Sequence, residues 1–294
     1  MSKNSVIFMT GATGYLGSHI LPNLVDCGHS VYCLKRDSSN LWRLGNLASK
    51  VSWVDLETVD FNSFFSEHKI ELILHCATDY GRKKTDPIQT VEANLILPLK
   101  MLHAAVIQGV HCFINTDTVL DKRINNYSLS KQQFVEWLET YSEQIVGVNV
   151  ALEHFYGPND DPSKFVTYII QSLLDDVPEI RLTEGHQKRD FIHVDDVVTA
   201  IIKLIDSSSE FSPNFHRYEV GSGEPIEIRD FISLAKKLSG NEKSYLNFGA
   251  IPYRENEVMC SGVDTSGLRK LGWKPEVSLE QGLNRTINVD RKRL

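Results

Sequence analysis

The stretch "SVIFMTGATGYLGSHILPNLVDCGH", residues 5–29, sets three glycines between an apolar run and an amphipathic segment. The run predicts a buried strand, and the segment predicts a helix that ends at Gly28. One of the three glycines makes a tight turn, one lets the backbone approach a pyrophosphate, and one lets the helix pack closely on the strand. Their placement predicts a dinucleotide-binding turn at a helix N-terminus rather than a merely structural turn. The residues of this turn expected to contact the cofactor are Gly11, Thr13, Gly14, Tyr15, Leu16 and Gly17.

Apolar runs alternate with amphipathic segments through the first half of the chain. The runs that predict strands are "SVIFMT", "SVYCLK", "VSWV", "ELILHCA", "HCFINT" and "IVGVNVAL". This alternation predicts the α/β class, a Rossmann-type doubly wound parallel sheet with helices on both faces. The pattern changes after residue 152, where we expect a smaller C-terminal α/β substrate-binding lobe to begin. Residues 1–152 plus about 187–207 are expected to form the NADP-binding domain, and residues 153–186 plus about 208–294 the lobe.

The composition excludes several classes of partner. The formal charge of -7 and the lack of a long basic run argue against nucleic acid and anionic membranes. The first apolar run breaks at Gly11, and no later stretch is expected to stay apolar for about 18 residues, so neither a signal peptide nor a membrane span is predicted. Five scattered cysteines without metal-ligand spacing indicate free thiols in a reducing compartment and no metal site. We therefore expect a cytoplasmic protein.

The end of the second strand indicates which dinucleotide binds. An acidic side chain there would hold the ribose 2′-hydroxyl of NAD, whereas a cation accommodates the 2′-phosphate of NADP. Lys35 and Arg36 occupy this place in "VYCLKRDSS", which favours NADP(H) over NAD(H). The alternative is that both are solvated charges and that Asp37 turns inward. Asp55, followed by Leu56, is expected at the adenine amino group, although a surface position for this acid is nearly as plausible.

The next strand end adds one more expected cofactor contact. Ala77 closes the strand in "HCAT". Its small side chain would let the backbone pass beside the cofactor.

Two Tyr-x-x-x-Lys pairs occur, a number close to chance, so their contexts must decide between them. Between Tyr80 and Lys84 a glycine interrupts and a proline follows, so the pair is not expected to share a helical face. Tyr127 and Lys131 lie one turn apart in "NYSLSKQQFVEWLE", residues 126–139, in line with an apolar stripe. A tyrosine with a pKa near 10 exchanges protons poorly at neutral pH unless a cation stabilises its phenolate, and Lys131 would do so. The pair predicts catalysis; the alternative for Tyr127 is a packed aromatic at a helix start.

A hydroxyl is expected to orient the carbonyl that receives the proton. Thr116 lies at the end of the fifth strand in "FINTDT", at the carboxyl edge where ligands bind such sheets. Thr118 is its rival, because period-two alternation points both hydroxyls to the same side.

With these motifs in this order, the chain resembles the extended short-chain dehydrogenases/reductases, the nucleotide-sugar epimerases and dehydratases. The longer strings "LEHFYGPND", "RDFIHVDDVV", "EVGSGEPIEIRDF", "LNFGAIPYRENEVM" and "LGWKP" look most like the CDP-abequose and CDP-paratose synthases. These are NADPH-dependent 4-reductases of a CDP-4-keto-6-deoxyhexose in bacterial surface-polysaccharide (O-antigen) synthesis. The resemblance implies a nucleotide-sugar substrate bound by the C-terminal lobe, and a homodimer paired through the helices of residues 88–109 and 128–143.

The resemblance also implies which residues contact the substrate. His154 stands where the family commonly has an asparagine near the sugar diphosphate, and Lys164 and Phe165 begin a helix that lines the nucleotide pocket. Arg254 with Glu257 matches an Arg/acid pair that closes over the nucleotide. An arginine offers a diphosphate two parallel donors, although each of these charges could also be an ordinary surface group. The full expected set is Thr118, His154, Lys164, Phe165, Arg189, Arg254 and Glu257.

Departures from the family select among its reactions. Family dehydratases carry Thr-Asp-Glu where this chain reads Thr116-Asp117-Thr118, so the glutamate that would remove a proton beside the ketone is missing. Epimerases retain NAD, usually with an acid at the end of the second strand, whereas Lys35 and Arg36 favour a cofactor that arrives reduced. Reduction of the 4-keto group is therefore expected. The alternatives are an NAD-dependent 4-epimerase and a non-catalytic NADP sensor.

Overall fold

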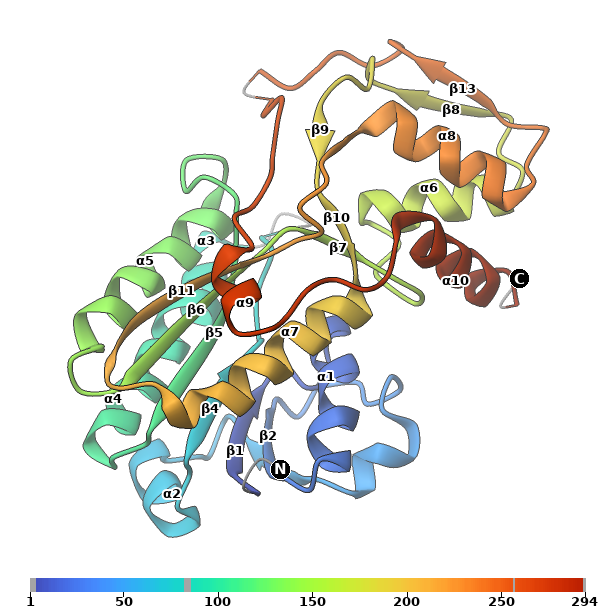
Figure 1. Cartoon of the computed structure of the whole chain (residues 1–294). Helices are drawn as coiled ribbons and strands as arrows, with labels where there is room; N and C mark the ends of the chain where they lie inside the picture. The colour runs from blue at the N-terminus through green and yellow to red at the C-terminus, as the bar shows by residue number, and fades with distance from the viewer. Residues whose placement is uncertain (1–3, 82–85, 256, 293–294) are drawn as a thin grey trace. The chain divides into compact units, whose positions relative to one another are not determined.

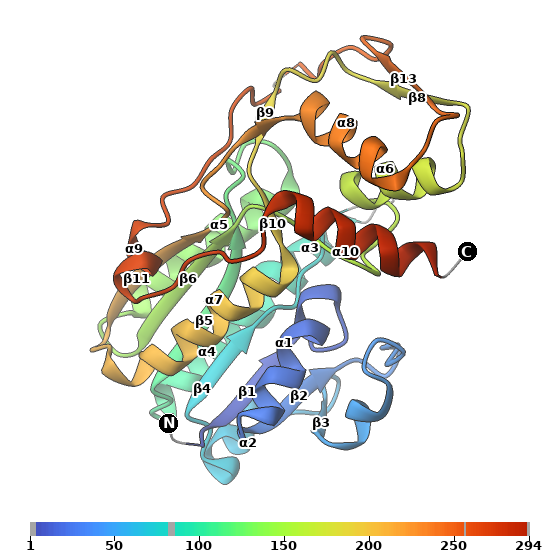
Figure 2. The ribbon, with the colours of Figure 1, turned by 45° about the vertical axis from the view of Figure 1, so that its right-hand side comes forward.

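The structure, a computed structural model, describes residues 4–81, 86–255 and 257–292. Contacts divide the chain into two compact units, Met1–Leu152 with Val198–Glu219 and Glu153–Val197 with Val220–Leu294. Figures 1 and 2 show the elements of both.

A seven-stranded sheet with the order β11-β6-β5-β4-β1-β2-β3 forms the centre of the first unit. Its strands are β1 (Val6–Thr10), β2 (Ser30–Lys35), β3 (Ser52–Asp55), β4 (Leu72–His75), β5 (Cys112–Thr118), β6 (Val146–Leu152) and β11 (Asn214–Val220). The neighbours from β6 through β3 pair in parallel, and the order reverses at β1, so the carboxyl ends of β1 and β4 flank a crossover point. This arrangement confirms the predicted doubly wound α/β sheet.

Helices cover both faces of the sheet. One face carries α2 (Phe61–His68), α4 (Leu97–Ile107) and α5 (Asn126–Tyr141), and the other carries α1 (Tyr15–Asp26) and α7 (Val194–Ser207) (Figures 1 and 2). The first face is sealed by large apolar side chains from strands and helices. Buried members of this cluster include Phe8, Phe65, Ile73, Met101, Leu102, Phe113, Phe134 and Leu138.

A continuous helical run, Pro87–Ile107, has the length and composition of a membrane span, one such run within the described residues. It comprises α3 (Pro87–Val91), the π-helical turn η2 (Glu92–Ile96) and α4. Its mean hydropathy is high, but Glu92, Asn94 and Lys100 interrupt the run, so it does not stay apolar for about 18 residues. Its apolar side chains pack in the core against the sheet, among them Met101, Leu102, Ala104 and Ala105.

The second unit contains short strand pairs and helices. Its strands are β7 (His154–Tyr156), β8 (Glu179–Leu182), β9 (Lys188–Arg189), β10 (Phe191–His193), β12 (Ile226–Glu227) and β13 (Tyr245–Phe248), paired as β10-β7, β12-β9 and β13-β8. Its helices are α6 (Phe165–Leu174), α8 (Ile228–Ser239), α9 (Ser266–Lys270) and α10 (Leu279–Arg291). A core around Ile169, Ile170, Phe231 and Leu283 joins α6, α8 and α10. The unit is thus a smaller α/β lobe, as predicted.

The division between the units begins where the sequence predicts, after Leu152, but the returning segment differs. Val198–Glu219 belongs with the sheet in place of residues 187–207. The physical reason is β11, which the sequence analysis did not assign to the main sheet and which extends that sheet beside β6. Residues 187–197 instead contribute β9 and β10 to the second unit.

Candidate active site

The glycine turn joins β1 to α1 and is closely packed. Gly11 has a φ of +71°, and a Cβ on it would lie 2.5 Å from the Ala77 amide nitrogen. A Cβ on Gly17 would lie 2.1 Å from the Gly11 carbonyl oxygen, so only glycine lets α1 approach the turn this closely. Gly14 is the N-cap of α1 and has no side chain to cap the first amides. These features fit a pyrophosphate bound at the helix N-terminus.

The ends of β2 and β3 lie side by side, because Lys35 pairs with Asp55 in register. Arg36 is exposed, and its amide donates to Ser39 Oγ at 3.1 Å. Bonds with Glu57 are the largest cause that lowers the pKa of Asp55, which keeps this carboxylate charged at the surface. The Leu56 amide donates to the Lys35 carbonyl. The four predicted residues of this edge therefore lie together.

Arg43 is a cation near this edge that the sequence analysis missed. Its guanidinium lies 4.4 Å from the centroid of the Trp42 ring and 5.9 Å from that of Tyr15, the first residue of α1. Cation–π contact with two rings orients the guanidinium. The signal in the sequence was the adjacent Trp-Arg pair in "SNLWRL", but nothing local linked it to Tyr15.

Helix α5 presents the predicted catalytic pair. Asn125 and Ser128 form a capping box that fixes the helix start: Asn125 Oδ1 accepts the Ser128 amide at 2.8 Å, and Ser128 Oγ accepts the Asn125 amide at 3.3 Å. Tyr127 is half-buried in the first turn, and Lys131, one turn later, is 1% exposed. Burial lowers the pKa of Lys131, while Asp117 and Cys76 oppose that shift. Lys84, of the rival pair, lies outside the described residues.

The two candidate threonines differ in their hydrogen bonds. Thr116 is buried, and its hydroxyl donates to the His75 carbonyl at 3.1 Å. To hold a ketone oxygen, this hydroxyl has to rotate away from that carbonyl. Thr118 accepts the Leu120 amide at 3.2 Å, which leaves its own hydrogen for another acceptor. Both residues lie in the last three positions of β5, on the edge of the sheet that also carries Ala77.

Below Thr116, a neutral histidine fills the end of β4. His75 is fully buried, and burial first and then the Lys131 charge hold its pKa well below the ordinary value. Its Nδ1 lies 2.8 Å from Thr10 Oγ1, which in turn accepts the Ala77 amide. The strand ends of β1 and β4 are thereby tied together beside the glycine turn.

Asn94 is a second residue that the sequence analysis missed. It lies in the π-helical turn η2, is fully buried, and uses its whole amide. Oδ1 accepts the Asp79 amide and the Thr78 hydroxyl, and Nδ2 donates to the Asp79 carbonyl and to Ser130 Oγ. These bonds hold the segment after β4 against α5. The segment ends with Tyr80, whose ring centroid lies 5.0 Å from that of Tyr127.

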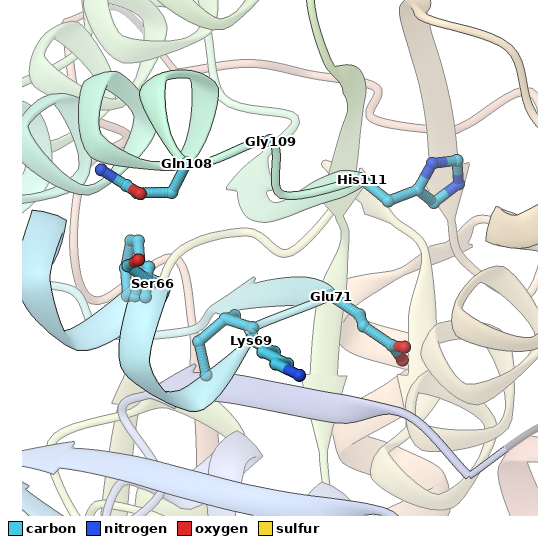
Figure 3. A pocket seen from close by; sticks show the side chains of 8 residues that line it. Ser66, Lys69, Glu71, Gln108, Gly109 and His111 are labelled. Carbon is cyan, nitrogen blue, oxygen red and sulfur yellow. The ribbon is translucent and has the colours of Figure 1, made fainter.

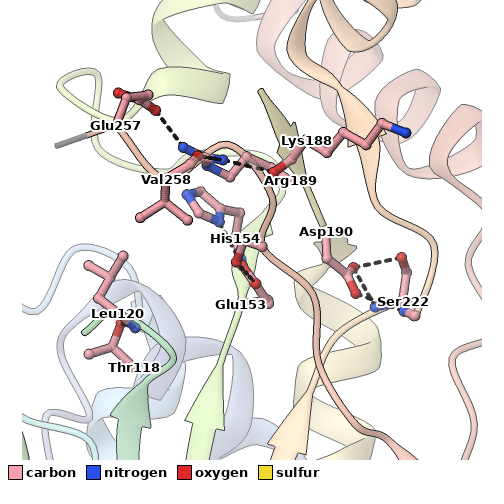
Figure 4. Close-up of polar contacts among 12 residues, drawn as sticks. Thr118, Leu120, Glu153, His154, Lys188, Arg189, Asp190, Ser222, Glu257 and Val258 are labelled. Atoms are coloured by element: carbon pink, nitrogen blue, oxygen red, sulfur yellow. Dashed lines mark hydrogen bonds and ion pairs between the residues drawn. The ribbon is translucent and has the colours of Figure 1, made fainter. Parts of the chain in front are cut away.

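The predicted substrate residues all belong to the second unit except Thr118, and Figure 4 shows several of them. Burial alone would raise the pKa of Glu153, but bonds from His154 and from Ser261 Oγ outweigh it and lower that pKa. His154 Nδ1 lies 2.7 Å from Glu153 Oε2. Lys164 pairs with Asp160 at 3.0 Å. The ring of Phe165 is stacked on Phe191 with centroids 6.5 Å apart.

The expected Arg254/Glu257 pair is arranged differently. Glu257 Oε1 binds Arg189 Nη2 at 2.5 Å, and Arg189 Nη1 also donates to the Val258 carbonyl (Figure 4). The Arg254 carbonyl only accepts the Glu257 amide, at 3.1 Å. Glu257, the acid of the expected pair, therefore binds Arg189 at the end of β9.

A surface depression of about 340 Å³ lies at the opposite end of the sheet (Figure 3). Its lining residues precede β4 and β5, so it opens at the amino ends of these strands. None of the predicted site residues lines it, and no group of three or more His, Cys, Asp or Glu side chains within residues 4–81, 86–255 and 257–292 could hold a metal ion. The residues lining the depression are Phe65, Ser66, Lys69, Ile70, Glu71, Gln108, Gly109 and His111.

Comparison with known proteins identifies the family. Residues 7–221 match the NAD dependent epimerase/dehydratase family. The CDP-abequose synthase of Salmonella muenchen is 33% identical over 298 residues, which cover 98% of this chain and 99% of that protein. A putative UDP-glucose 4-epimerase of Methanocaldococcus jannaschii is 23% identical and covers 96% of this chain and 97% of its own.

Solved structures share the fold. The UDP-glucose 4-epimerase of Thermotoga maritima, solved with UDP-glucose, superposes with a TM-score of 0.84 at 24% identity, covering 98% of this chain and 99% of its own. The identity and coverage of the relatives carry the assignment, and the glycine turn fits it. The chain belongs to the NAD dependent epimerase/dehydratase family and is an enzyme of the NAD(P)-dependent oxidoreductase type.

Proposed function

We propose that this enzyme uses NADPH to reduce the 4-keto group of a nucleotide-linked 4-keto-6-deoxyhexose, with CDP as the nucleotide, in the synthesis of surface-polysaccharide sugars in the cytoplasm. The observation that carries the proposal is the buried Lys131 one turn behind Tyr127 on α5, at the carboxyl edge that also holds the glycine turn. The 33% identity to CDP-abequose synthase over nearly the whole chain supports the substrate class.

Tyr127, Lys131 and Thr116 have different tasks in this reaction. Bound NADPH supplies the hydride for C4 of the sugar. Tyr127 gives its hydroxyl proton to the ketone oxygen as the new C–H bond forms, and the resulting hydroxyl leaves with the sugar. The Lys131 ammonium stabilises the tyrosinate that remains and binds the nicotinamide ribose. Thr116 holds the ketone oxygen after its hydroxyl turns from the His75 carbonyl, so orientation supplies much of the rate.

The second unit supplies the proposed nucleotide-sugar contacts. A diphosphate carries charges that an arginine fork matches, and Arg189 is held in place by Glu257 and two backbone carbonyls. His154, oriented by the buried Glu153 carboxylate, is the proposed neighbour of the sugar diphosphate. Lys164, Phe165 and Arg254 are proposed to line the nucleotide.

The reaction is tested by following NADPH oxidation at 340 nm with a panel of CDP-, UDP-, GDP- and dTDP-linked 4-keto-6-deoxy sugars. We expect turnover with at least one and the highest kcat/KM with a CDP-sugar. An NAD-dependent 4-epimerase would instead purify with bound NAD and interconvert sugars without consuming NADPH. A sensor would bind NADPH and turn over none of the panel, which would refute the proposal.

The choice of cofactor gives a second expected result. Replacing Arg36 by alanine is expected to raise the Kd for NADPH about tenfold and to leave the Kd for NADH nearly unchanged, because one surface ion pair to a phosphate is worth about 1 to 2 kcal/mol. Quenching of tryptophan fluorescence measures both constants. The matched control is Arg217→Ala, a partly exposed arginine of β11 that pairs with Glu219. Equal weakening of both cofactors would argue that Arg36 does not read the 2′-phosphate.

We also propose a homodimer through the outer faces of the helical run Pro87–Ile107 and of α5. These faces expose large apolar side chains, which a second copy would cover. The exposed residues are Ile88, Ile107, Leu129 and Trp137.

A further inference from the structure

A chain of hydrogen bonds runs behind Lys131 through β5 and β6. Lys131 Nζ donates to Asn115 Oδ1 at 3.4 Å, and Asn115 Nδ2 donates to Asn149 Oδ1 at 2.7 Å. Asn149 Nδ2 then donates to Asp117 Oδ2 at 2.9 Å. The exposed fraction is 1% for Lys131, 0% for both asparagines and 5% for Asp117. A buried ammonium and a buried carboxylate are thus joined through two amides.

The sheet register explains how these residues meet. Asn115 lies opposite Asn149 in the parallel pair of β5 and β6, and Asp117 follows Asn115 by two residues. Side chains two apart on a strand point to the same face, so all three polar groups share the face that α5 covers. The same face carries the rings of Phe113 and Phe134 and, opposite Asn115 on β4, the buried His75. Polar groups in such a place are retained only when they are hydrogen-bonded.

The two ends of the chain fix the direction of the amides between them. An ammonium can only donate, and an ionised carboxylate can only accept. Asn149 must therefore turn its NH₂ to Asp117 and its oxygen to Asn115, and Asn115 must turn its oxygen to Lys131. The amide dipoles line up from the carboxylate to the ammonium. Within the described residues, Asn115 is the acceptor recorded for Lys131 Nζ, so Asp117 acts on the lysine only through this chain and through space.

We propose that Asp117 is a positioning residue that keeps Lys131 charged and aimed at Tyr127, by orienting Asn149 and Asn115. This inference rests on the proposed function, in which the ammonium stabilises the tyrosinate. The groups that face Lys131 from neighbouring elements are Asp117 on β5, the Cys76 thiol after β4 and the neutral His75 on β4. Among them Asp117 is the carboxylate. Asp117 is the aspartate of the Thr116-Asp117-Thr118 segment. In this chain that aspartate therefore supports Lys131 from behind the catalytic pair.

The direct test is the ionisation of Lys131 in the full-length protein, with no substrate present. The ¹³Cε signal of labelled lysine, assigned with Lys131→Met, gives the pKa. Asp117→Asn keeps the shape but removes the charge, so the Lys131 pKa is expected to fall by about one unit, which is the effect of one nearby charge in a partly dry site. Asn149→Leu, which cuts the chain at another point, is expected to shift the pKa in the same direction.

The matched control is Asp190→Asn, the same substitution at a buried aspartate of the second unit. Asp190 is 0% exposed and accepts the Ser222 amide, the Ser222 hydroxyl and the Gly223 amide (Figure 4). This variant is expected to lose thermal stability without moving the Lys131 titration. If Asp117→Asn loses stability and the Lys131 titration stays where it is in the wild type, Asp117 has only a structural role and the inference is overturned.

Activity gives a second readout, which separates this inference from the proposed function. The alkaline limb of the kcat profile of Asp117→Asn is expected to move to lower pH by the same amount as the Lys131 pKa. If the Lys131 pKa moves but the protein reduces none of the sugar panel, the role of Asp117 is supported and the proposed reaction is refuted. If the Asp117→Asn enzyme is active and its alkaline limb does not move, the proposed reaction is supported and the role of Asp117 is refuted.

Discussion

Tyr127→Phe is expected to lower kcat for reduction of the keto sugar by about 10³-fold and to change the Kd for NADPH by less than about threefold. The phenylalanine keeps the ring, including its contact with Tyr80, so the shape of the site is retained. What disappears is the proton donor, and a positioned donor contributes typically about 10² to 10⁴ in rate. Because the lost interaction is made only as charge develops on the ketone oxygen, the loss falls on kcat.

The measurement is the single-turnover rate of NADPH oxidation at saturating substrate, beside the Kd from fluorescence titration. Tyr141→Phe is the matched control, since Tyr141 lies at the end of the same helix with its hydroxyl 3.2 Å from His103 on the surface. That variant should keep the wild-type rate. A Tyr127→Phe enzyme with kcat within tenfold of the wild type would show that another group delivers the proton.

Much of the fold could be predicted from residues that specify one local conformation through their sterics or their spacing. The glycines of residues 11–17 specify a strand-to-helix turn through sterics alone, and the structure shows backbone atoms where their Cβ atoms would stand. The Tyr127 and Lys131 spacing places both on one face of a helix, because helix geometry is fixed by sequence separation. The capping box at Asn125 could have been found in the same way from its Asn-x-x-Ser spacing.

The remainder depends on contacts between segments far apart in the sequence. Asn115 and Asn149 stand out only as polar residues inside buried strands, and their partnership follows from the β5–β6 register, which the sequence does not give. The chemistry of a carboxylate and a guanidinium does not tell whether Glu257 pairs with Arg254 or with Arg189. The three-dimensional arrangement does, and it pairs Glu257 with Arg189. The run of residues 87–107 has a length and a mean hydropathy that fit a membrane helix as well as a core helix. Only the packing of one of its faces against the sheet distinguishes the two.

Gly17→Ala is expected to lower the free energy of unfolding by about 3 kcal/mol, at the upper end of the overpacking costs seen in well-packed sites. The new Cβ would lie 2.1 Å from the Gly11 carbonyl oxygen and 2.9 Å from Ala12 Cα. Both are backbone atoms, so relief requires α1 to shift along the turn. That shift moves the first amides of the helix, and the Kd for NADPH is expected to rise at least about tenfold with it.

Gly14→Ala separates the packing effect from the binding effect. Gly14 has φ -76° and ψ 176°, an extended conformation that alanine adopts, and its Cβ would meet only the Gly11 oxygen, at 3.2 Å. Urea unfolding should place this variant within about 1 kcal/mol of the wild type. The methyl group would nevertheless stand where a pyrophosphate must approach the backbone, so NADPH binding should weaken as much as in Gly17→Ala. If both variants bound NADPH as the wild type does, the cofactor would have to lie elsewhere than over this turn. A methyl group at Gly14 could not be accommodated there without weakening the binding of a pyrophosphate.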